Sequence, residues 1–138
     1  MSQIGWLQLS LIALILWGLW SFLGKIALEN LDWKSVFVFA GVAQIFVIAI
    51  FYAATKPPMV FDMKTCYAMI VGILGVSATM AFYYALEQGR ASIVVPLTAT
   101  YPLVTVILAA VLLREKLSIN QGAGVLLAIL AIVLISTE

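Results

Sequence analysis

Residues 91–116 read ASIVVPLTATYPLVTVILAAVLLREK, and the organisation of the whole chain can be worked out from this stretch. The run from Ala91 to Leu113 contains no charged side chain. At about 1.5 Å of helix per residue, such a run is long enough to cross a hydrocarbon layer about 30 Å thick. The charged sequence Arg114-Glu115-Lys116 then ends it. The stretch therefore predicts a membrane-spanning helix at about residues 92–113.

Two prolines, Pro96 and Pro102, interrupt this predicted span. Proline has no backbone N–H, so Pro102 leaves the carbonyl of Thr98 without its helical donor. Lipid cannot satisfy that carbonyl, and the span is expected to face protein or water. The hydroxyls of Thr98 and Tyr101 lie close by in the sequence, and carriers hold substrates at broken helices of this kind. The alternative is a proline kink that serves packing alone.

The composition places the chain among polytopic membrane proteins. Its 138 residues are 65% hydrophobic and 9% charged, whereas soluble domains are about 25% charged. The net charge of +1 and the absence of histidine argue against a nucleic-acid-binding face and a histidine-centred metal site. The single cysteine, Cys66, provides no thiol pair. We expect no cofactor, no metal and no nucleic-acid partner. No nucleophile–base pair or phosphate-binding loop is found, so no enzymatic activity is expected.

Polar connections divide the chain into five predicted transmembrane helices that form one all-α domain, residues 1–138. The predicted helices lie at about residues 4–28, 35–54, 65–87, 92–113 and 119–135.

A polar and aromatic stripe runs along the first predicted helix. Trp17, Ser21 and Lys25 recur at a spacing of four residues and therefore share one face. Lys25 lies in the predicted helix, about one helical turn before the loop that follows it. It either extends to the lipid headgroups or points into a cavity, where it would bind an anion or a carboxylate.

The end of the third predicted helix carries a second polar face. Tyr84 and Glu87 lie three residues apart on one face, with Tyr83 beside them. Paired tyrosines near a membrane boundary usually belong to an interfacial aromatic belt. Here they adjoin a carboxylate and are expected on the same side of the membrane as Lys25, so they are also candidates for substrate binding.

Small residues mark the last predicted helix. Gly122, Gly124 and Ala128 include a small-x-x-x-small spacing, which lets two helices meet closely. The contact is made either with another subunit or with a helix of the same chain.

Short motifs follow one another in a fixed order along the chain: Leu16-Trp17-Gly18 with Phe22 and Lys25, Tyr84-Ala85-Leu86 with Ala91, Pro96-Leu97, Pro102-Leu103, and Leu113-x-Glu115-x-Leu117-Ser118 with Gly122. Together they resemble an EamA-type domain of the drug/metabolite transporter superfamily. The resemblance implies a small-metabolite transporter built from five-helix repeats, usually two per chain in opposite orientations. This chain has one such repeat, so a second half would have to come from elsewhere.

The function expected from these features is that of a carrier for a small polar or zwitterionic metabolite, working by alternating access. We expect it to be a multi-pass protein of the cell (cytoplasmic or inner) membrane. The alternative is a non-transporting accessory or assembly subunit of a membrane complex. Eight residues are predicted to bind the substrate: Trp17, Ser21, Lys25, Tyr83, Tyr84, Glu87, Thr98 and Tyr101.

The basic residues are almost balanced between the two membrane faces. Five spans place Lys56, Lys64, Arg114 and Lys116 on one side and Lys25, Lys34 and Arg90 on the other, which is 4 against 3. The Lys and Arg bias of short loops sets orientation, so both orientations are expected to insert. An antiparallel homodimer, joined through Gly122, Gly124 and Ala128, would then rebuild the inverted-repeat plan. The alternative is a single orientation, with the N-terminus in the cytoplasm, in a parallel dimer or with a partner chain.

Overall fold

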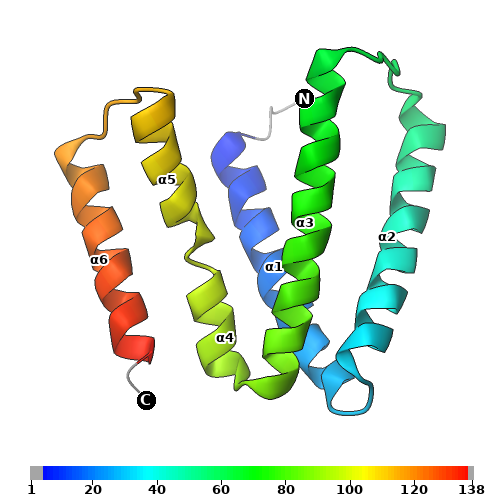
Figure 1. The fold of residues 1–138 in the computed structure, drawn as a ribbon, viewed down its shortest axis with the longest axis horizontal. Helices are drawn as coiled ribbons and strands as arrows, with labels where there is room; N and C mark the ends of the chain where they lie inside the picture. The colour runs from blue at the N-terminus through cyan, green and yellow to red at the C-terminus, as the bar shows by residue number, and fades with distance from the viewer. Residues whose placement is uncertain (1–4, 137–138) are drawn as a thin grey trace. The chain divides into compact units, whose positions relative to one another are not determined.

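The computed structural model describes residues 5–136, and all of its regular structure is helical in that range. The helices are α1 (Trp6–Leu28), α2 (Trp33–Thr55), α3 (Met63–Gln88), α4 (Ala91–Thr98), α5 (Tyr101–Leu112) and α6 (Ile119–Ser136) (Figure 1). Four helical stretches are long and apolar enough to cross a membrane, namely α1, α2, α3 and Ala91–Leu112, and α6 is a shorter apolar helix. The predicted all-α, polytopic membrane fold is confirmed. Residue 4, where the first helix was expected to begin, lies outside the described range.

The stretch that was expected as one helix at residues 92–113 is divided into α4 and α5. Ala99 and Thr100 separate the two helices. Pro102 stands at the beginning of α5 and has no N–H to give to Thr98, so the helical ladder is interrupted here. The N–H of Leu103 instead reaches only three residues back, to the carbonyl of Thr100 at 2.9 Å. Proline chemistry thus accounts for the position of the break.

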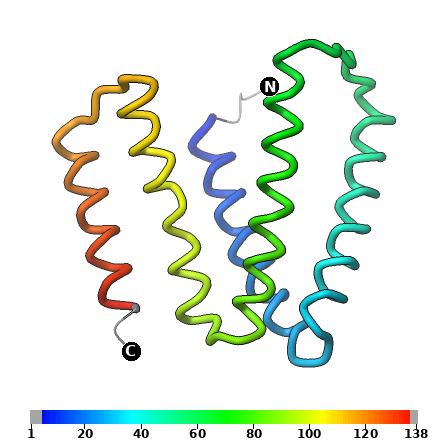
Figure 2. Tube along the Cα trace, in the orientation of Figure 1, coloured from blue at the N-terminus to red at the C-terminus, as the bar shows by residue number. Residues whose placement is uncertain are grey.

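The chain forms two compact units, one that ends at Gln88 and one that begins at Gly89. The first unit contains α1, α2 and α3, and the second contains α4, α5 and α6. Within the first unit, α1 and α3 run in one direction and α2 runs in the other, as the tube in Figure 2 shows. The α1–α2 connection and the end of α3 therefore lie together at one end of this unit.

The buried residues of the first unit gather at that end. They are Ser21 and Gly24 near the end of α1, Val36 near the start of α2, and Tyr83 and Leu86 near the end of α3. At the other end the side chains of the three helices are mostly exposed. Exposed apolar side chains on helices of this composition are suited to lipid or to a further protein chain.

The second unit has packing and capping contacts of its own. Helix α4 packs against α6. Helix α6 is capped reciprocally, because the N–H of Ser118 donates to Gln121 Oε1 at 2.8 Å and the N–H of Gln121 donates to Ser118 Oγ at 3.2 Å. The predicted contact residues Gly122 and Gly124 face open space, since an added methyl group would meet no atom within 4 Å at either position.

Candidate functional site

Lys25 joins α1 to the end of α3. Its Nζ donates a hydrogen bond to the carbonyl oxygen of Leu86 at 2.9 Å. The last carbonyls of a helix have no helical donor, and a cation is favourable at that end of the helix dipole. Lys25 therefore stabilises the C-terminal end of α3.

Glu87 makes the complementary contact with the start of α2. Its Oε1 accepts a hydrogen bond from the N–H of Trp33 at 2.9 Å. Trp33 is the first residue of α2, and its N–H has no partner within the helix. A second carboxylate, that of Asp32, accepts the N–H of Ser35 at 2.7 Å. Two carboxylates, one from α3 and one from the chain just before α2, thus cap the same helix.

The electrostatics of this cap depend on pH through Asp32. The hydrogen bond from the Ser35 backbone, aided by the Ser35 side chain, holds the pKa of Asp32 below its usual value. Because the pKa is lower in the folded state, the full contribution of this cap to folding stability is present at pH values above the unfolded-state pKa. It is lost as the pH falls through the lowered pKa.

These contacts tie α1, α2 and α3 together at one end of the first unit. Lys25 and Glu87 were predicted to bind substrate, and in the structure each has a partner at the end of a neighbouring helix. The partners lie 61 and 54 residues away in the sequence. The geometry therefore favours a structural role for both charges.

We expect Glu87→Ala to lower the thermal stability of the protein in detergent and Glu87→Gln to lower it much less. Alanine leaves the Trp33 N–H without a partner, at a cost of about 1–3 kcal/mol, whereas glutamine keeps an acceptor oxygen. Lys25→Met should act like Glu87→Ala because the Leu86 carbonyl loses its donor. Melting temperatures test this expectation. Equal, wild-type values for Glu87→Ala and Lys25→Met would show that neither contact supports the fold.

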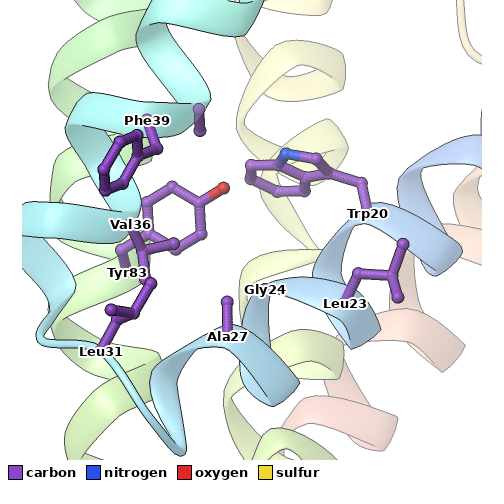
Figure 3. Close-up of a pocket in the computed structure, with 9 residues that line it drawn as sticks. Trp20, Leu23, Gly24, Ala27, Leu31, Val36, Phe39 and Tyr83 are labelled. Atoms are coloured by element: carbon purple, nitrogen blue, oxygen red, sulfur yellow. The ribbon is translucent and has the colours of Figure 1, made fainter.

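A groove lined mainly by apolar and aromatic residues lies next to this tied end, between the three helices (Figure 3). Its volume is about 270 Å³, and its lining includes Trp20, Gly24, Val36, Phe39 and Tyr83. The ring of Trp20 stacks on Phe82 with centroids 5.2 Å apart and tilts toward Tyr83 at 5.5 Å. Tyr83 is only 2% exposed. The predicted residue Tyr83 is thus chiefly part of the packing between α1 and α3.

Trp20 and Gly24 were not singled out from the sequence. The available signal was their spacing of four residues, which places an aromatic ring and a residue without a side chain on one face of α1. On that face α1 packs closely against α3, because a Cβ atom added to Gly24 would lie 3.1 Å from Tyr83 Cε1.

The other predicted residues of the first unit differ in exposure. Trp17 and Tyr84 are 61% and 52% exposed. Ser21 is buried, and its hydroxyl donates to the carbonyl oxygens of Trp17 and Gly18 at 2.9 and 3.0 Å. The Tyr84 ring lies 5.3 Å from the ring of Trp33. This aromatic pair at a helix end has the character of an interfacial belt.

The second unit contains the other predicted binding residues, Thr98 and Tyr101, on either side of the break between α4 and α5. The Thr98 hydroxyl donates to the carbonyl oxygens of Val94 and Val95 at 2.8 and 3.0 Å. The Thr98 carbonyl lacks its helical donor because residue 102 is proline. Tyr101 is the first residue of α5 and is 56% exposed. Oxygen acceptors are therefore concentrated at the break.

This break lies near the middle of the span. Eight residues of α4 precede it and twelve residues of α5 follow it. At about 1.5 Å per residue these segments reach roughly 12 Å and 18 Å from the break. Pro96 lies within α4 and Pro102 lies at the start of α5. The acceptors thus lie deep in the membrane-spanning stretch, where no charged side chain accompanies them.

A groove leads from the break along α5 and α6. It has a volume of about 460 Å³, and its lining runs from Pro102 and Thr105 to Glu115, Gln121 and Gly124. Glu115 is the charged residue of this lining. Within residues 5–136 the acidic, cysteine and histidine side chains form no cluster suited to a metal ion.

The fold and the broken span together define a multi-pass membrane protein with a helix of the type found in carriers. The model of the EamA-like transporter family matches residues 4–137. An uncharacterized protein of Methanocaldococcus jannaschii is 35% identical over 132 residues, which cover 93% of each chain. No solved structure matches the chain.

The chain belongs to the EamA-like transporter family. It is therefore a membrane transporter of the drug/metabolite transporter superfamily, as its sequence motifs indicated. The family is one of transporters and not of enzymes.

Proposed function

We propose that the chain carries a small polar or zwitterionic metabolite across the membrane by alternating access, with the α4–α5 break contacting the substrate. The observation that carries this proposal is the position of the break near the middle of an uncharged span. In carriers built from inverted repeats, unwound segments of broken helices hold substrates and ions near the midplane.

The chemistry of the break favours a substrate that donates hydrogen bonds. The Thr98 hydroxyl already donates within α4, so its oxygen and the Thr98 carbonyl offer lone pairs. The Thr100 hydroxyl likewise donates to the Leu97 carbonyl. An ammonium or hydroxyl group of a metabolite matches this set of acceptors.

The proposal includes a second copy of the chain. One five-helix repeat supplies half of the usual family plan, and two copies in opposite orientations would supply both halves. The relative from Methanocaldococcus jannaschii supports this reading, because the match covers 93% of that protein's length and the relative therefore has about the size of one repeat. The 4-to-3 balance of basic residues permits both orientations. Gly122, Gly124 and Ala128 of α6 are the proposed contact residues, and the cytoplasmic membrane is the proposed location.

Transport by the purified chain tests the function. The protein is reconstituted into liposomes, which are incubated with a mixture of free amino acids as small zwitterions, and the lumen is analysed by mass spectrometry. We expect at least one amino acid to enter faster than it enters protein-free liposomes. Entry at the protein-free rate for every amino acid, with the protein folded in the liposomes, would contradict the proposal and favour an accessory subunit.

A further inference from the structure

The connection between α2 and α3, residues 56–62, and the first residue of α3 expose four large apolar side chains. Phe61 and Met63 are 86% and 81% exposed, and Met59 and Val60 are 65% and 63% exposed. Large apolar side chains that gather on one exposed segment usually mark a binding surface.

The end of this connection, where the chain enters α3, is held in place by local hydrogen bonds. Asp62 Oδ1 accepts the N–H groups of Lys64 and Thr65 at 2.9 and 3.0 Å. The Thr65 hydroxyl donates to the carbonyl oxygen of Val60 at 2.6 Å. The Val60 carbonyl and the N–H groups of Lys64 and Thr65 are thus satisfied, which lowers the cost of bringing this end of the connection to an apolar phase.

Two lysines flank the apolar segment. Lys56 caps the end of α2 in a left-handed conformation, with φ 44° and ψ 55°, and Lys64 lies in the first turn of α3. Asp62 is the acidic residue between them, and its carboxylate oxygen is occupied by N–H groups at the start of α3. A carboxylate at a helix N-terminus is offset by the helix dipole. The connection therefore presents apolar side chains between two positive charges.

The membrane itself is the partner that fits this surface. Helices α2 and α3 are both long and apolar enough to span the bilayer, so both ends of their short connection lie at the bilayer surface. Apolar residues at that depth bury themselves at the boundary between headgroups and acyl chains, and lysines are attracted to anionic headgroups. We infer that residues 59–63 insert into the membrane interface and that Lys56 and Lys64 bind anionic phospholipid headgroups. The inference rests on the membrane-spanning helices and is independent of the substrate proposed above.

The depth of a spin label at residue 61 tests this inference. The label is attached to Phe61→Cys in a Cys66→Ser background, and the protein is reconstituted in phosphatidylcholine with or without phosphatidylglycerol. Collision with oxygen reports the lipid phase, and collision with a neutral nickel chelate reports water. We expect the oxygen-to-nickel ratio at residue 61 to be severalfold higher than at Asn30→Cys, in the connection at the other end of the unit. Phosphatidylglycerol should raise it further.

The role of the lysines is tested in the same measurement. Lys56→Gln together with Lys64→Gln should remove the effect of phosphatidylglycerol while the label stays in the lipid phase. A label at Met59→Cys repeats the experiment if Phe61→Cys does not fold. A water-like ratio in both lipids would overturn the insertion. Low collision with both reagents would indicate that protein covers the segment, and an unchanged effect of phosphatidylglycerol in the double variant would overturn the headgroup contact.

Discussion

Replacing Gly24 with leucine is expected to separate α1 from α3 and to cause the largest loss of stability in the first unit. A Cβ atom at this position would already lie 3.1 Å from Tyr83 Cε1. Tyr83 and Leu86, the two side chains that a larger residue would meet, are buried, at 2% and 0% exposed. Forcing atoms into a packed contact costs about 1–3 kcal/mol, and leucine adds three further carbon atoms beyond Cβ. Gly24→Ala should therefore be mild and Gly24→Leu severe.

Gly18→Leu is the matched control, because it lies on the same helix and an added methyl group there meets no atom within 4 Å. Thermal unfolding of the purified proteins in one detergent compares the variants. We expect the melting temperature of Gly24→Leu to fall well below that of Gly18→Leu. Equal melting temperatures would show that the Gly24–Tyr83 contact does not hold the helices together.

The second large effect is expected on transport, from Pro102→Ala. Alanine restores the N–H that the Thr98 carbonyl lacks and permits one continuous helix through residues 91–112. Thermal stability should be unchanged or higher, because the interrupted series of helical backbone hydrogen bonds becomes continuous. Transport should fall, because the Thr98 carbonyl is then bonded within the helix and no longer accepts a hydrogen bond from the substrate. The loss of one hydrogen bond of about 1–1.5 kcal/mol corresponds to roughly a tenfold lower rate.

Pro96→Ala serves as the control for Pro102→Ala. Pro96 lies within α4, so its replacement restores an N–H without closing the break. The two variants are compared by their initial rates of uptake into liposomes and by their melting temperatures. Uptake unchanged in Pro102→Ala, together with a raised melting temperature, would assign the proline to packing.

Membrane class and helix content could be predicted from the sequence because length and hydropathy decide them directly. The uncharged run from Ala91 to Leu113 indicated a span, and Pro102 indicated where that span would be interrupted. Family membership was indicated by motifs along the whole chain and is confirmed by the family match.

The contacts between helices could not be predicted, because these helices carry apolar side chains on all of their sides. In a soluble helix the apolar face shows which side packs, but membrane helices lack that signal. The hydrogen bond of Lys25 to Leu86 and that of Glu87 to Trp33 join residues more than fifty positions apart. Only the tertiary arrangement shows that these two charges meet helix ends. Binding of substrate by the predicted residues stays a prediction.

Pairing of two copies in opposite orientations is the central claim, and Cys66 provides its most direct measurement. Cys66 is exposed near the start of α3 and is the single cysteine of the chain. Intact cells are labelled with a membrane-impermeant thiol reagent before and after permeabilisation, with Cys66→Ser as the control for unspecific labelling. We predict two comparable populations, with roughly half of the protein labelled before permeabilisation, because the basic residues favour neither orientation strongly. A single population, either fully labelled in intact cells or fully protected until permeabilisation, would contradict dual insertion and the antiparallel pair.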